Sequence, residues 1–180
     1  MAAGSAAAAR RGDGDDEHKT IATRLLATHW QVNRAFPRQA LITIEKAIKA
    51  SEAAHVGEIR FAVEGALHTT PLFKGQSARE RAIEVFSQLR VWDTEHNNGV
   101  LIYLLLADRD IEIVADRGVH AKVGVHEWEK ICRKMERAFK EGNYEAGVVS
   151  GIQAVTQHLA VHFPSVGDGR NELPDKPVVL

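Results

Sequence analysis

Two short polar stretches of this 180-residue chain carry side chains of the kinds that bind hard cations. Asp93, His96, Asn97 and Asn98 directly precede a long apolar run, and Asp116 follows the next apolar segment. Carboxylate and amide oxygens are suitable ligands for Ca²⁺ or Mg²⁺, and a bound cation of this type can polarise a phosphoryl oxygen. The residue types therefore predict a candidate cation site if the fold brings the two stretches together.

Three strands are predicted around these stretches. Residues 58–66 alternate between apolar and polar side chains, which is the pattern of a strand covered on one face. Residues 99–107 are almost wholly apolar, as in a strand covered on both faces. Residues 110–116 alternate again after a short polar break, and they predict the less buried return strand of a hairpin.

The predicted strands bring the polar stretches to one end of a sheet. If the first two strands are parallel, Glu58 and Gly99 begin them at the same end, and the hairpin returns the chain there at Asp116. The predicted metal ligands are Glu58, Asn97, Asn98 and Asp116. The candidates for a general base that orients water are Asp93 and His96. A solvated loop end without a ligand is the alternative, because loop ends are usually polar.

The register of the hairpin follows from the length of its loop. A two-residue loop at residues 108–109 would pair Ala107 with Asp110 and, by counting back, Leu101 with Asp116. Directly paired residues have Cβ atoms about 4.5–5.5 Å apart. This register would place Asp116 beside the second strand close to its start.

Apolar residues at helical spacing predict helices before, between and after the strands. One helix ends before Pro37, and a second contains Pro37 in its first turn and ends near residues 55–57. The capping-box pattern of residues 77–80 begins a third helix, and two more end at Gly142 and before Pro164. Helices are plentiful enough to cover both faces, so the fold class is α/β with a mixed sheet.

The composition excludes several classes of protein. A net charge of -1 from 23 basic and 24 acidic residues lacks the clustered Lys and Arg of a nucleic-acid-binding surface. The single cysteine, Cys132, cannot form an internal disulfide and is predicted to be a small buried hydrophobe. The longest apolar run, residues 100–107, is too short for a membrane helix. We therefore expect a cytoplasmic protein without a membrane anchor in this chain.

The same features indicate one domain with two extensions. Residues 1–19 are rich in Ala, Gly and Asp and are predicted to be disordered. Residues 20–164 form the predicted domain. Residues 165–180 are rich in Gly and Pro and are predicted to be a flexible tail.

Several blocks of the chain resemble, in their order and spacing, those of the TPM-domain family. This family is named after a thylakoid-lumen phosphatase-like protein, a photosystem II repair protein and a worm receptor modulator. The blocks are residues 57–60, 98–103, 115–119, 123–128 and 139–147. The resemblance covers about residues 40–164 and is closest to a small bacterial branch without a membrane anchor. It implies an α/β/α sandwich, and it implies divalent-cation binding, phosphatase activity or a role as an accessory protein.

Two departures from the family pattern affect these expectations. The family often has Asp-Asn-Gly where this chain has Asn97-Asn98-Gly99, and Gly-x-Gly where this chain has Asp116-Arg117-Gly118. The first departure removes an anionic ligand and the second supplies one.

Our first hypothesis is a TPM-like accessory module that binds a divalent cation and a protein partner that the sequence does not identify. The alternative is a metal-assisted phosphatase acting on phosphate monoesters.

Overall fold

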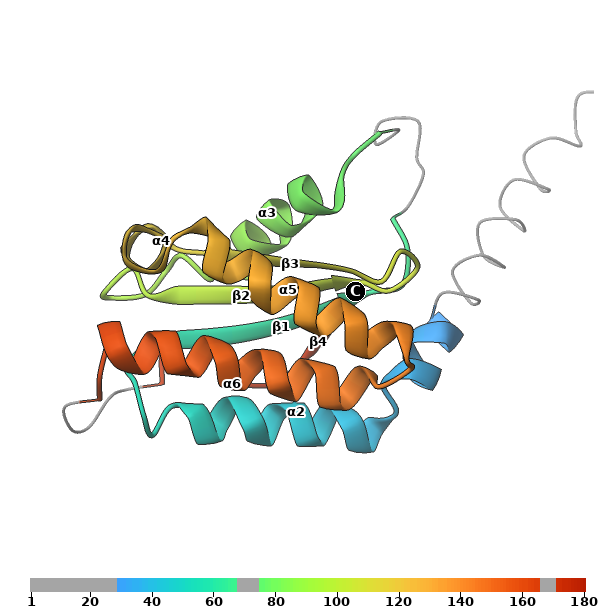
Figure 1. The fold of residues 1–180 in the computed structure, drawn as a ribbon, viewed down its shortest axis with the longest axis horizontal. Coiled ribbons are helices and arrows are strands. Elements are labelled where there is room, and N and C mark those ends of the chain that lie inside the picture. Colours follow the sequence, from blue (N-terminus) through green and yellow to red (C-terminus); the bar gives the residue numbers. More distant parts are fainter. Residues whose placement is uncertain (1–28, 68–74, 166–170) are drawn as a thin grey trace, which may run out of the picture.

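The computed structural model describes residues 29–67, 75–165 and 171–180. A four-stranded mixed sheet of order β3-β2-β1-β4 lies between helices on both of its faces, as Figure 1 shows. The predicted three-layer α/β/α sandwich is therefore confirmed. Residues 29–35 are helical, and the rest of the helix expected before Pro37 lies outside the described residues, as does the segment 1–19.

The two central strands have the predicted relation. β1 (Glu58–Glu64) and β2 (Gly99–Leu105) are parallel, and their first residues are paired with each other. All seven residues of β2 are buried, as its apolar sequence predicts. β3 (Asp110–Ala115) pairs with β2 in the antiparallel direction and is less buried than β2, which confirms the hairpin.

The predicted register of the hairpin is wrong by two residues. Asp110 pairs with Leu105 and not with Ala107, so the loop contains residues 106–109. The N–H groups of Leu106 and Ala107 donate to carbonyls at the end of β1, which removes these residues from the hairpin ladder. Arg109 has φ 54 and closes the turn by donating to the Leu106 carbonyl. A shift of two residues leaves the facing of every side chain unchanged.

β1 is covered on both faces, whereas its alternating pattern predicted one covered face. Its apolar residues Ile59, Phe61 and Val63 pack into the larger core. Its polar residues are buried as well, because α3 (Ala78–Gln88) and the C-terminal residues cover the second face. The predicted capping box of Ser77 and Glu80 begins α3.

Three long helices cover the first face of the sheet. They are α2 (Arg38–Ser51), α5 (Val125–Lys140) and α6 (Tyr144–His162). Pro37, predicted in the first turn of α2, is its N-cap residue, and the helix ends at Ser51 rather than near residues 55–57. His55 instead forms an isolated bridge with Pro164. Among the helices of the described ranges, none is long and apolar enough to cross a bilayer.

Two elements were not predicted. A short helix, α4 (Arg117–Val123), follows β3 at the end of the sheet where β2 begins (Figure 1). β4 (Val178–Val179) pairs in parallel with Ala62 and Val63 of β1. We expected a flexible tail from residue 165, but residues 171–180 pack along β1 and bury Leu173.

Candidate functional site

The strand ends bring three predicted site residues to one edge of the sheet. Glu58 pairs with Gly99, and the Glu58 N–H donates to the Asn98 carbonyl at 3.3 Å. The Asp116 N–H donates to the Gly99 carbonyl at 2.8 Å. Glu58, Asn98 and Asp116 therefore lie at consecutive positions across the starts of β1 and β2 and the end of β3.

The first turn of α4 packs directly against the turn that precedes β2. A Cβ atom on Gly118 would lie 2.5 Å from the Asn97 carbonyl oxygen and 3.0 Å from that of His96. Asn97 has φ 51, in the left-handed region that Asn tolerates better than most residues. Thr94 Oγ1 accepts the Asn98 N–H at 3.1 Å and fixes the turn from within. The two polar stretches thus form one contact region.

Asn98 contributes a fully buried amide to this region. Its Nδ2 donates to the Val56 carbonyl at 2.7 Å, and this bond fixes the orientation of the side chain. Its Oδ1 is buried and, within the ranges that the structure describes, has no hydrogen-bond partner. Leaving a buried acceptor unsatisfied costs about 1–3 kcal/mol. A ligand that carries positive charge would remove this cost.

Asp116 has a second oxygen of the same kind. Its side chain is buried, and Oδ1 accepts the N–H of Arg117 at 2.6 Å at the start of α4. Its Oδ2 is buried, and no described residue is its hydrogen-bond partner. A carboxylate oxygen attracts a cation more strongly than an amide oxygen does, so Asp116 is the best-placed anionic ligand at this end of the sheet.

Glu58 shares the edge but its carboxylate is already engaged. Its Oε1 accepts the N–H of Glu172 at 3.0 Å and its Oε2 accepts that of Leu173 at 3.3 Å. Burial raises the pKa of Glu58 above its usual value, although these two N–H groups act in the opposite direction. By alternation with Ile59, Glu58 faces α3 and the C-terminal residues. Asn98 faces the opposite way, toward Val56, whose N–H donates to the Phe163 carbonyl at the end of α6.

The remaining predicted residues lie on the outside of the same turn. Asp93, His96 and Asn97 are all exposed. Within the ranges that the structure describes, no group of three or more His, Cys, Asp or Glu side chains is arranged to hold a metal ion. A cation at this edge would therefore depend on Asp116 together with amide oxygens, backbone carbonyls and water.

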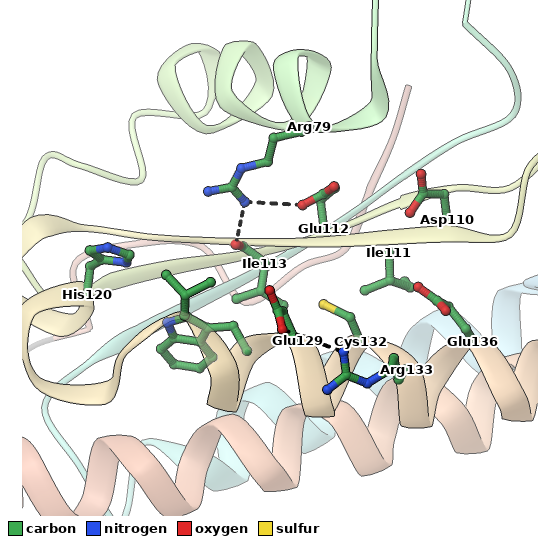
Figure 2. A pocket seen from close by; sticks show the side chains of 12 residues that line it. Arg79, Asp110, Ile111, Glu112, Ile113, His120, Glu129, Cys132, Arg133 and Glu136 are labelled. Atoms are coloured by element: carbon green, nitrogen blue, oxygen red, sulfur yellow. Dashed lines mark hydrogen bonds and ion pairs between the residues drawn. The ribbon is translucent and has the colours of Figure 1, made fainter.

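A separate cavity lies on the outer edge of β3 and was not predicted from the sequence. Its volume is about 400 Å³, and α3, β3 and α5 contribute to its walls (Figure 2). Cys132 lines it, and burial raises the pKa of its thiol to about 12, so the thiol stays protonated. Cys132 was predicted to be a small buried hydrophobe, and it is half-buried in the wall of this cavity.

The fold and the strand-end site define a TPM-type α/β/α domain. The sequence model described as the TPM domain matches residues 33–158 of the chain. The chain belongs to the TPM domain family.

Two solved structures show what the chain is similar to. The BA42 protein of the psychrophilic bacterium Bizionia argentinensis is 31% identical, with a TM-score of 0.68, over 79% of this chain and 93% of that one. The N-terminal domain of a protein from P. gingivalis is 23% identical, with a TM-score of 0.52, over 63% of this chain and 69% of that one. The second likeness shows the fold alone. A search of curated proteins gave no match.

Proposed function

We propose that this TPM domain is a binding module that holds a divalent cation, Ca²⁺ or Mg²⁺, where residues 93–99 meet residues 116–118, and presents this end to a protein partner. The observation that supports it is the buried Asp116 Oδ2, which has no hydrogen-bond partner among the residues that the structure describes. Asp116 lies beside the start of β2, because its N–H donates to the Gly99 carbonyl. Buried acceptors at a loop end are the groups that a hard cation satisfies.

The residues have separate roles in this proposal. Asp116 Oδ2 supplies the negative charge. Asn98 holds the turn before β2 in place through its bond to the Val56 carbonyl, because by strand alternation its side chain faces the opposite side of the sheet from that of Asp116. Exposed Asn97 and water complete the outer side. Glu58 has a structural role. Its carboxylate accepts two backbone N–H groups and so holds the C-terminal residues at the same edge. With a single carboxylate the affinity is expected to be weak, on the order of 10⁻⁴ M or weaker.

The test is an NMR titration of the full chain with CaCl₂ and with MgCl₂. Amide shifts are expected at residues 93–99 and 116–118. Asp116→Asn should abolish them while keeping the start of α4, because Asn is as good an N-cap as Asp. Asn97→Asp should tighten binding by adding an exposed carboxylate at a position whose positive φ Asp also tolerates.

Asp108→Asn is the matched control for the cation titration. It removes the same charge from an exposed residue at the opposite end of β3, so the titration should be unchanged. The proposal is wrong if neither cation moves these amides, or if Asp116→Asn and Asp108→Asn have equal effects.

A metal-assisted phosphatase is the alternative function of the same site. Asp93 and His96 are its general-base candidates, and both are exposed beside the proposed cation. Hydrolysis of an aryl phosphate by the purified chain, dependent on added cation and lost in Asp116→Asn, would support the phosphatase. Cation binding without any hydrolysis would support the binding module.

A further inference from the structure

Among the strands of the described residues, none pairs with the outer edge of β3. The bond from Asp116 N–H to Gly99 O makes these two residues a hydrogen-bonded pair of the antiparallel ladder. Because such pairs alternate, the N–H and C=O groups of Ile111, Ile113 and Ala115 point away from β2. The Ile113 carbonyl confirms this direction, since it accepts a hydrogen bond from outside the sheet.

That hydrogen bond comes from a side chain of α3. Arg79 Nη1 donates to Ile113 O at 2.7 Å and also forms an ion pair with Glu112 at 3.2 Å. The Arg79 side chain is 47% exposed, so it can leave this position at a low cost. Arg79 thus covers the middle of an edge that could otherwise pair with another strand.

The edge forms the floor of a groove. Figure 2 shows Arg79 of α3 on one side of β3, and Glu129, Cys132, Arg133 and Glu136 of α5 on the other. We call this cavity of about 400 Å³ the β3-edge groove. An edge strand that lies between two helices is a geometry in which an extended peptide can add a strand.

The groove carries an excess of negative charge. Four carboxylates line it, against two guanidinium groups. The carboxylates are those of Asp110, Glu112, Glu129 and Glu136. Arg79 pairs with Glu112 and Arg133 with Glu129, and in the described part of the chain neither Asp110 nor Glu136 has an ion pair with a cation. Burial raises the pKa of both Asp110 and Glu112, and a cation beside these carboxylates would offset the cost of burying their charge.

Trp128 gives an independent indication of a ligand. Its side chain lines the groove and is 5% exposed, and its buried Nε1 has no hydrogen-bond partner in the described part of the chain. An indole N–H is a donor only, so it needs an acceptor that this part of the chain does not supply. A peptide carbonyl is such an acceptor.

We propose that the β3-edge groove binds an extended peptide segment that carries a lysine or arginine. The segment pairs with the outward backbone groups of Ile111, Ile113 and Ala115 and becomes a fifth strand. It replaces the Asp110 carboxylate at the Ile111 N–H and the Cys132 thiol at the Ile113 N–H. Its basic side chain neutralises Asp110 and Glu136, and one of its carbonyls accepts the Trp128 N–H. Arg79 leaves the Ile113 carbonyl when the peptide binds.

The test uses the full chain and two eight-residue peptides of alternating Val and Thr, one with a central Lys and one with Glu in its place. In NMR titrations the Lys peptide is expected to shift the amides of residues 110–115 and the Trp128 indole N–H signal. The Glu peptide should bind about tenfold more weakly, which corresponds to one favourable charge contact.

Substitutions test whether the Lys peptide binds in this groove or on any acidic surface of the protein. Glu136→Gln should weaken binding of the Lys peptide about tenfold, whereas Glu145→Gln on α6 is a matched control without effect. Arg79→Ala should strengthen binding, because it frees the Ile113 carbonyl. Asp116→Asn should leave peptide binding unchanged. A negative result for the peptide is therefore independent of a negative result for the cation site.

Three results would overturn the proposal. One is the absence of shifts along β3 at millimolar Lys peptide, and another is equal binding of the two peptides. The third is dimerisation of Arg79→Ala through β3 without peptide binding, which would show that Arg79 protects the edge from a second copy of the chain.

Discussion

Replacing Tyr103 by Phe tests whether a buried polar network stabilises the face of the sheet under α3. Tyr103 is completely buried in the centre of β2. Its hydroxyl donates to Glu64 Oε2 at 2.7 Å. Arg81 of α3 donates to the same carboxylate through Nε at 2.8 Å and through Nη2 at 3.2 Å. The network therefore joins two strands and the helix above them.

The size of the stability loss in Tyr103→Phe depends on the hydrogen bonds that Glu64 keeps. A hydrogen bond to a charged group contributes about 1.5–3 kcal/mol. Tyr103→Phe leaves no cavity, and Glu64 keeps its bidentate pair with Arg81. We therefore expect the lower end of the range, about 1.5 kcal/mol of lost stability. For a domain of this size the loss should lower the Tm by about 3–6 °C.

Urea unfolding followed by circular dichroism measures this loss. Glu64→Gln should cost more, about 3 kcal/mol, because it leaves the Arg81 guanidinium, 20% exposed, with Glu84 as its remaining carboxylate partner. The double variant should cost less than the sum of the two, because both changes remove the same bond. A loss below about 0.5 kcal/mol in Tyr103→Phe would refute the stabilising role of the network.

Two further substitutions test the edge that holds the candidate site. Gly118→Ala would place a Cβ 2.5 Å from the Asn97 carbonyl oxygen, so the start of α4 must move. Thermal denaturation should show a loss of about 1–3 kcal/mol despite the higher helix propensity of Ala, and cation shifts should weaken. Burial and the nearby Asp175 carboxylate raise the pKa of Glu52 to about 8. Because the folded state holds this proton more tightly than the unfolded state, stability should fall from about pH 4.5 to about pH 8 and then level off. Glu52→Gln should flatten this slope in urea unfolding, and an unchanged slope would contradict the assignment.

The local parts of the fold were predictable because short-range patterns determine them. The change of period at Glu58 marked the start of β1, and the apolar run after Asn98 marked β2. The capping box at Ser77 specified the start of α3 from four residues alone. From these elements the parallel pairing and the common strand end followed.

The cover of the second face was not predictable from the same patterns. Glu58, Arg60 and Glu64 alternate with apolar residues and therefore resembled solvent-facing positions, yet all three are buried. Glu58 and Glu64 have hydrogen-bond partners far along the chain, and such a residue looks in the sequence like one that is exposed to water. The covering segment ends in a strand of two residues, which is too short to give a period.

The candidate site was predictable in position and only partly in composition. Strand pairing placed Glu58, Asn98 and Asp116 at one edge, as expected. The engagement of Glu58 with the N–H groups of Glu172 and Leu173 depends on a contact between residues more than a hundred positions apart. No local pattern encodes such a contact, and without it the carboxylate appeared free to bind a cation.

The antiparallel return of β3 explains both proposed sites. With a crossover connection β3 would run parallel to β2 and finish at the far end of the sheet, and Asp116 would then not reach the edge where Asn98 lies. Because the hairpin ends the described sheet on this side, β3 also keeps one row of backbone groups that no described strand pairs. Arg79 and the carboxylates of α5 lie along that row. The two sites are at different places on the same strand, so a cation at its end and a peptide along its edge can be tested independently in the same chain.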